Sequence, residues 1–123
     1  MGNERTLVED IMTTPLETIS PDAKVVEAAA VMRDMDISAL LVTTAPPSII
    51  TSTDVLDAVA QGMDTDDLLV SDLMTEHVET VPPDLPLGET AAMMTNFGIN
   101  HLPVVDDDYI GMVSSSDITK QLH

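Results

Sequence analysis

Residues 10–13 read Asp-Ile-Met-Thr, and residues 72–75 read Asp-Leu-Met-Thr. The two stretches lie 62 positions apart (72 − 10), and further pairs of similar segments follow in the same order. These pairs are 21–22 with 83–84, Met32 with Met94, 37–42 with 99–104 and, one position further apart (117 − 54 = 63), 49–54 with 112–117. Because the matches keep order and register along the chain, the sequence is a tandem duplication of a unit of about 60 residues.

Each copy predicts the same order of elements: a short helical turn, a strand, a helix, two paired strands and a final helix. In the first copy we expect them over 8–12, 17–19, 23–35, 39–42 and 48–50, with the last helix beginning at Thr53-Asp54. In the second copy the turn, the strands and the final helix are expected over 70–74, 78–81, 102–105 and 109–113 and from Ser116-Asp117. The hydroxyl and carboxylate at each final-helix start are suited to capping free amides.

The long helix of each copy carries apolar residues at helical spacing, which predicts one buried face. These residues are Val25, Ala28, Ala29, Met32 and Met35 in the first copy, and Leu87, Thr90, Ala91, Met94 and Phe97 in the second. The preceding Pro-Asp pairs predict Asp22 and Asp84 as the helix caps. Gly98, where the first copy has Asp36, predicts the C-terminal stop.

A lone unit of about 60 residues buries little surface. We therefore expect an α/β fold in which two β-α-β-β-α repeats pack sheet to sheet about a pseudo-twofold axis. Ligand sites would lie in the clefts between them. On the sequence we place the first domain at 7–62, a linker at 63–68 and the second domain at 69–122.

The net charge is −18, from 22 acidic and 4 basic residues. Such a chain repels nucleic acid and anionic membranes, so neither is expected as a partner. Since salt screens the self-repulsion, the composition indicates a salty cytoplasm such as that of a halophilic archaeon; an ordinary acidic mesophilic protein is the alternative. The chain has no cysteine and no hydrophobic run of signal or membrane length, so we expect a soluble, cytoplasmic protein.

The repeated segments resemble a tandem pair of cystathionine-β-synthase (CBS) domains, the arrangement called a Bateman module. The resemblance is carried by 8–13, 37–42, 49–54, 71–75, 98–106 and 111–118, and it extends over about residues 7–122. It implies a stand-alone regulatory pair that binds an adenosine-containing ligand (AMP, ADP, ATP, S-adenosylmethionine or NAD) and signals to a protein effector. It also implies disc-like homodimers.

Thr51 with Asp54, and Ser114 with Asp117, recur at the junction between a strand and a helix. A carboxylate there is able to accept hydrogen bonds from a ribose diol, while the hydroxyl and free amides face a phosphate. The alternative is that both aspartates only cap their helices. Lys120 lies one helical turn beyond Asp117, which favours the second motif as the phosphate site.

The resemblance adds positions expected to surround the adenine. They are Thr14, Pro15 and Leu16, the matching His77 and Val78, and the strand starts at Ile37–Ala39 and Ile99–His101. His101 either contacts the ligand or lies half-buried against a neighbouring carbonyl. The first copy departs from the second, with Ser48 in place of Gly111 and Leu41 in place of Pro103, which points to a degenerate first site.

The sequence offers no catalytic pattern: it lacks cysteine, a Ser-His-Asp pattern and a glycine-rich phosphate loop. The three histidines lack metal-ligand spacing, so we expect no metal site and no required cofactor. An interaction scaffold with empty sites remains the alternative to a ligand sensor. A homodimer is expected because the final helices carry apolar residues, at 55–59 and at 118 and 122, that a lone module would expose.

Overall fold

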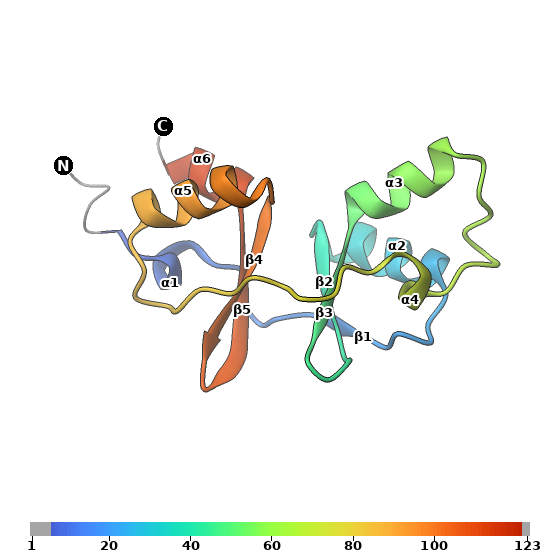
Figure 1. Ribbon diagram of the computed structural model, residues 1–123, viewed down its shortest axis with the longest axis horizontal. Helices are drawn as coiled ribbons and strands as arrows, with labels where there is room; N and C mark the ends of the chain where they lie inside the picture. Colours follow the sequence, from blue (N-terminus) through green and yellow to red (C-terminus); the bar gives the residue numbers. More distant parts are fainter. Residues whose placement is uncertain (1–5, 122–123) are drawn as a thin grey trace. The chain divides into compact units, whose positions relative to one another are not determined.

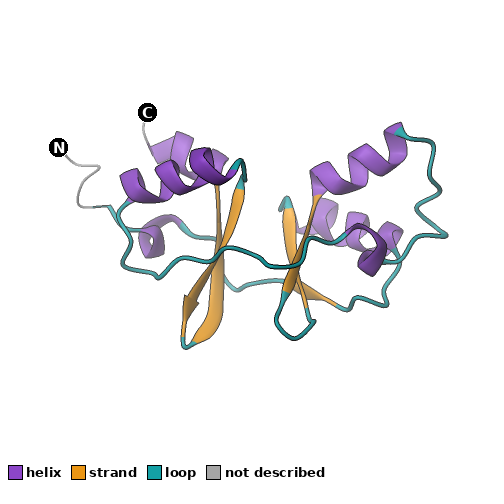
Figure 2. Cartoon of the chain, viewed as in Figure 1, coloured by secondary structure: helices purple, strands orange, loops and turns teal. Residues whose placement is uncertain are grey.

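The computed structural model describes residues 6–121 of the chain and has an α/β fold. Its helices and strands form two compact units (Figures 1 and 2). Residues 17–78 form the first, which we call the central unit. Residues 6–16 and 79–121 together form the second, the terminal unit.

The central unit contains the strands and the two longer helices of the first repeat. They are β1 (Thr18–Ile19), α2 (Val25–Met35), β2 (Ala39–Val42), β3 (Ser48–Thr51) and α3 (Ser52–Ala60), followed by the short α4 (Val70–Leu73). The sheet order is β1-β2-β3, with β1 parallel and β3 antiparallel to β2. Strands β2 and β3 are almost fully buried, as the short apolar runs predict.

The terminal unit repeats this plan with α1 (Val8–Ile11), α5 (Leu87–Phe97), β4 (His101–Asp106), β5 (Asp108–Ser114) and α6 (Ser115–Gln121). Strands β4 and β5 form an antiparallel hairpin whose turn is Asp107, in the left-handed region at φ 66°. The prediction of a strand over 78–81 is wrong except at its last residue. Only Val81 pairs, in an isolated parallel bridge to Val104.

The helical turn of each repeat packs in the unit of the other repeat. Thr13 and Met112 exchange backbone hydrogen bonds of 2.8 and 3.1 Å, and Thr75 and Ile49 exchange bonds of 2.8 and 3.0 Å. Each sheet therefore gains a short extra bridge from the segment that begins the other repeat. The duplication in the sequence and the compact units of the fold are consequently divided at different places along the chain.

The starts of the two long helices differ from the prediction. Asp22 and Asp84 do not cap them; α2 begins at Val25 and α5 at Leu87, without a side-chain cap. Instead, the Val25 N–H donates to the Leu68 carbonyl (2.8 Å) and the Leu87 N–H to the Thr6 carbonyl (3.2 Å). Free amides at a helix start need an acceptor, and here distant backbone supplies it.

The helix ends and the buried faces follow the sequence more closely. Gly98 terminates α5 in the left-handed conformation, as predicted, and Asp36 terminates α2 in the same conformation. Each unit has its own core, around Leu40 and Ile50 in the central unit and Leu102 and Val113 in the terminal unit. The last apolar position of each helix was predicted wrongly, since Met35 and Phe97 are 51% and 55% exposed.

Candidate functional site

The first candidate motif lies where β3 ends and α3 begins. The Asp54 N–H donates to Thr51 Oγ1 (3.3 Å), and the Thr51 N–H donates to Asp54 Oδ2 (2.9 Å). This reciprocal pair is a capping box and fixes the first turn of α3. It uses one carboxylate oxygen of Asp54, and Oδ1 is not part of the cap.

The second motif has the same geometry at the junction of β5 and α6. The Asp117 N–H donates to Ser114 Oγ (3.2 Å), and the Ser114 N–H donates to Asp117 Oδ2 (3.0 Å). Ser114 Oγ also lies 3.0 Å from Ser116 Oγ. Both aspartates thus cap their helices, and the remaining oxygen of each half-buried carboxylate has the acceptor capacity that a ribose diol needs.

The fold divides the predicted site residues into two groups. Eight belong to the terminal unit and four to the central unit. The terminal group is Thr14, Pro15, Leu16, Ile99, His101, Ser114, Asp117 and Lys120, and the central group is Thr51, Asp54, His77 and Val78. The exchanged segments produce this grouping, because each carries the residues after its Met-Thr pair into the other repeat's unit.

Direct pairing brings part of the terminal group together. His101, half-buried, is opposite Ser114 in the β4–β5 register. Residues 14–16 directly follow Thr13, which is bonded to Met112 two positions before Ser114. Lys120 is exposed in the last turn of α6, three positions after Asp117 and therefore on the same side of that helix.

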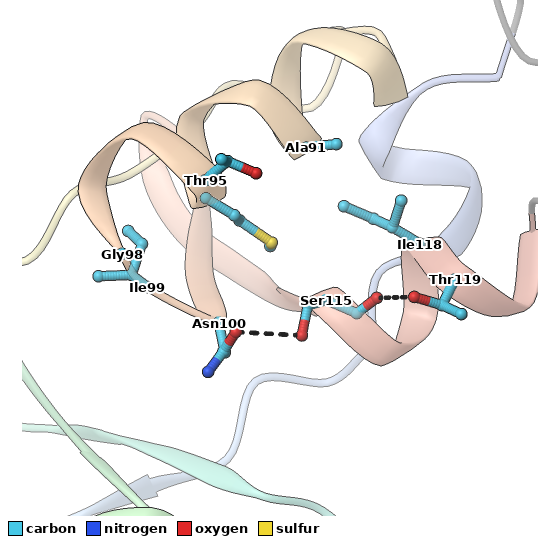
Figure 3. Close-up of a pocket in the computed structure, with 9 residues that line it drawn as sticks. Ala91, Thr95, Gly98, Ile99, Asn100, Ser115, Ile118 and Thr119 are labelled. Carbon is cyan, nitrogen blue, oxygen red and sulfur yellow. Dashed lines mark hydrogen bonds between the residues drawn. The ribbon is translucent and has the colours of Figure 1, made fainter.

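A cavity of about 430 Å³ lies between α5 and α6 (Figure 3). Of the positions predicted to surround the adenine, Ile99 and Asn100 line it. Sequence reasoning missed the rest of its lining, since small residues such as Ser115 and Thr119 carry no motif. A comparison of the two copies could have indicated this lining, because the first copy has Leu56 where the second has the smaller Thr119 (119 − 56 = 63).

The part of the chain that the structure describes contains no cluster of three or more acidic or histidine side chains suited to holding a metal ion. Among the same residues, no helix is long and apolar enough to cross a membrane.

Relatives of known sequence match most of this chain. The chain is 34% identical over 117 residues to an uncharacterised protein of Methanopyrus kandleri, covering 90% of this chain and 60% of that protein. It is 33% identical to the L-aspartate semialdehyde sulfurtransferase of Methanocaldococcus jannaschii over 98% of this chain but 24% of the enzyme. The chain thus spans less than two thirds of these relatives.

A solved CBS domain pair is similar over nearly its whole length. It is 32% identical, with a TM-score of 0.84 and coverage of 95% of both chains, and its crystal structure is a complex with 5′-methylthioadenosine and S-adenosyl-L-methionine. The CBS domain family model matches residues 8–61 and again residues 70–123. The chain therefore belongs to the CBS-domain family, as a tandem pair of CBS domains.

Proposed function

We propose that this CBS pair is a non-catalytic regulatory module that binds an adenosine-containing ligand and transmits its occupancy to a protein effector. The observation that carries the proposal is the complex of a similar CBS pair with 5′-methylthioadenosine and S-adenosyl-L-methionine. The two capping boxes support it, because each leaves one half-buried carboxylate oxygen outside the cap at the motif.

The better site is the one that Ser114 and Asp117 mark, with Thr14, Pro15, Leu16 and His101 around the adenine. Lys120 supplies a positive charge on the Asp117 side of α6, whereas the corresponding residue after Asp54 is Asp57 (57 + 63 = 120). A ligand phosphate is therefore repelled less at the terminal unit. The central-unit motif, with His77 and Val78, is the weaker site.

The negative charge of the chain favours some adenosine-containing ligands over others. At −18, the protein repels a triphosphate unless Mg²⁺ or salt screens it. A cationic ligand such as S-adenosylmethionine is attracted by this charge, and a monophosphate such as AMP experiences less repulsion than ADP or ATP. The same charge suits a cytoplasm of high salt, where we place the protein.

The competing function is a scaffold whose motifs only cap helices, and the observed caps favour it as the second candidate. Thermal melting in molar KCl separates the two. A sensor gains about 2.7 kcal/mol of stability with ligand at a hundred times Kd, so S-adenosylmethionine or AMP should raise the Tm clearly. If no adenosine compound moves the Tm, the scaffold function replaces the sensor.

A further inference from the structure

Residues 61–69 form a loop that joins the end of α3 to the start of α4 in the central unit (Figure 1). Gly62, at φ 81°, turns the chain out of α3. The Met63 N–H donates to the Ala58 carbonyl and the Gly62 N–H to the Val59 carbonyl, both at 3.0 Å. These are the two bonds of a Schellman motif, which commonly ends a helix. The backbone of Met63 is therefore fixed, while its side chain stays 45% exposed.

The loop is also held against the first turn of α2. The Val26 N–H donates to the carbonyl of Thr65, two positions after Met63, at 3.2 Å. Leu69 pairs with Lys24 in an isolated antiparallel bridge. Because amides at a helix start need acceptors from outside the helix, these bonds fix the loop on α2. Val26, Met63 and Leu69 are consequently held at one end of the central unit.

These three apolar side chains, which we call the apolar patch, are exposed. Val26 is 38% exposed, Met63 45% and Leu69 37%. The second repeat does not reproduce the patch, since it has Gly88 at the position of Val26 and the half-buried Leu7 at that of Leu69 (offset 62). Methionine adapts its shape readily, which suits a surface that binds a partner. The patch is thus a property of one unit and not of the repeated fold.

Exposed carboxylates surround the apolar patch. They are Glu27, which follows Val26, and Asp64, Asp66 and Asp67 of the loop. The Asp66 N–H donates to Asp64 Oδ1 (2.9 Å), which fixes the turn that carries them. Against these four acidic side chains stands the exposed Lys24. A partner with both apolar and basic side chains complements this surface, whereas another copy of an acidic chain brings like charges against it.

The loop connects two parts of the ligand motif of the central unit. Helix α3 begins at the cap that contains Asp54, and α4 is followed by Thr75, which is bonded to Ile49, and then by His77 and Val78. A partner bound to the loop therefore contacts the segment that joins these residues. That position gives ligand occupancy a short route to the partner.

We infer that the apolar patch and its surrounding carboxylates bind a basic amphipathic segment of the protein effector. Apolar side chains of the segment lie against Val26, Met63 and Leu69, and its Lys or Arg side chains lie against the carboxylates. The inference rests on the proposed function in taking this partner to be the effector.

The expected homodimer rests on a different surface, the apolar residues of the final helices. Leu56 and Val59 of α3 are 68% and 53% exposed, but Ile118, which was also expected to be exposed, is 5% exposed. Leu122 lies outside the described residues. A dimer formed through α3 does not require the apolar patch.

The test uses designed peptides and no adenosine compound, so that the inference and the proposed function fail separately. A fluorescent amphipathic helix of about 15 residues, with Leu on one face and Lys on the other, is titrated by anisotropy in molar KCl. At a Debye length of about 3 Å, general attraction to the −18 charge is screened and direct contacts remain. We expect saturable binding, and binding at least about fivefold weaker for peptides with Ser in place of Leu or Gln in place of Lys.

A pair of methionine variants locates the apolar contact. We expect Met63→Gln to weaken binding of the Leu/Lys peptide about fivefold or more, because apolar area is lost from the contact. Met35→Gln, at another exposed methionine of the central unit, is the matched control and should leave binding unchanged.

A pair of charge variants locates the carboxylates. Asp66→Asn combined with Asp67→Asn should weaken binding about threefold or more, since two exposed charge contacts are lost. Asp106→Asn combined with Asp108→Asn removes the same charge at the β4–β5 turn and should have no effect.

Three outcomes would overturn the inference. The first is no saturable binding of the Leu/Lys peptide to the wild type at about 1 mM. The second is an equal effect within either pair of variants, which would show attraction to the overall charge alone. The third is self-association, measured by sedimentation, that Met63→Gln removes, because the patch would then bind a second copy of the chain. Peptide binding without binding of any adenosine compound would keep the patch and remove the sensor.

Discussion

Four aspartates occupy the same position relative to a helix. Asp10, Asp54, Asp72 and Asp117 each accept a hydrogen bond from the backbone N–H three residues earlier, at 2.8 to 3.0 Å. All four therefore stabilise the first turn of their helices. The sequence alone could not distinguish an aspartate that only caps a helix from one that also binds a ligand. Asp54 and Asp117 differ from the others in being half-buried, whereas Asp10 and Asp72 are exposed. That difference in burial could be seen only in the folded chain.

A prediction at this scale concerns Lys120. We expect Lys120→Gln to weaken AMP binding about two- to fivefold, because an exposed charge contact contributes roughly 0.5–1 kcal/mol. Binding of 5′-methylthioadenosine, which has no phosphate, should not change. Calorimetric titration of the variant with both compounds measures the two effects, and an equal loss for both would show that Lys120 does not act on the phosphate.

At the level of helices and strands, local patterns predicted which elements form, and long-range contacts decided where they start. The left-handed stop at Gly98 and the buried runs of β2 and β3 follow from local sequence. The starts of α2 and α5 do not, because their first amides are satisfied by Leu68 and Thr6, 43 and 81 positions away in sequence (68 − 25, 87 − 6). The exchange of helical turns between units was likewise invisible, since each turn reads as part of its own repeat.

The exchanged segment around Thr13 should be sensitive to a side chain added at Gly111. A Cβ added there would lie 2.8 Å from Met12 Sδ and 3.0 Å from the Thr13 carbonyl oxygen. The methionine side chain is able to move, but the carbonyl belongs to the backbone bridge with Met112. We therefore expect Gly111→Ala to lower the free energy of unfolding by about 1–3 kcal/mol, measured by urea denaturation.

Gly88 is the matched control. It lies in α5 with nothing within 4 Å of an added Cβ, so Gly88→Ala should stabilise the protein by at most about 1 kcal/mol. If Gly111→Ala were as harmless as Gly88→Ala, the segment around Thr13 would not be held against β5 as described.

For the whole molecule, charge is the dominant property. Against 22 acidic residues, the described residues contain one ion pair, between the neighbouring and largely exposed Arg33 and Asp34. An exposed pair of this kind contributes little. The repulsion among the carboxylates is therefore not offset within the described part of the chain, and screening by dissolved salt must reduce it.

We expect the free energy of unfolding in urea to rise with KCl as the Debye length falls from about 10 Å at 0.1 M to about 3 Å at 1 M. The combined variant Asp106→Asn, Asp107→Asn and Asp108→Asn removes three adjacent exposed charges at the β4–β5 turn. It should be more stable than the wild type at low salt and equal to it at molar salt. Stability that is independent of KCl in both proteins would contradict adaptation to high salt.

The most direct test of the regulatory function is calorimetric titration of S-adenosylmethionine into Asp117→Ala and Asp72→Ala in molar KCl. Each variant loses the same kind of cap hydrogen bond, which costs about 1 kcal/mol of stability, but only Asp117 belongs to the proposed ligand site. We predict saturable binding to the wild type and to Asp72→Ala, and binding to Asp117→Ala weakened about tenfold or more, as expected when a charged hydrogen-bond acceptor is removed. No binding to the wild type at about 1 mM ligand, or equal binding to both variants, would contradict the account.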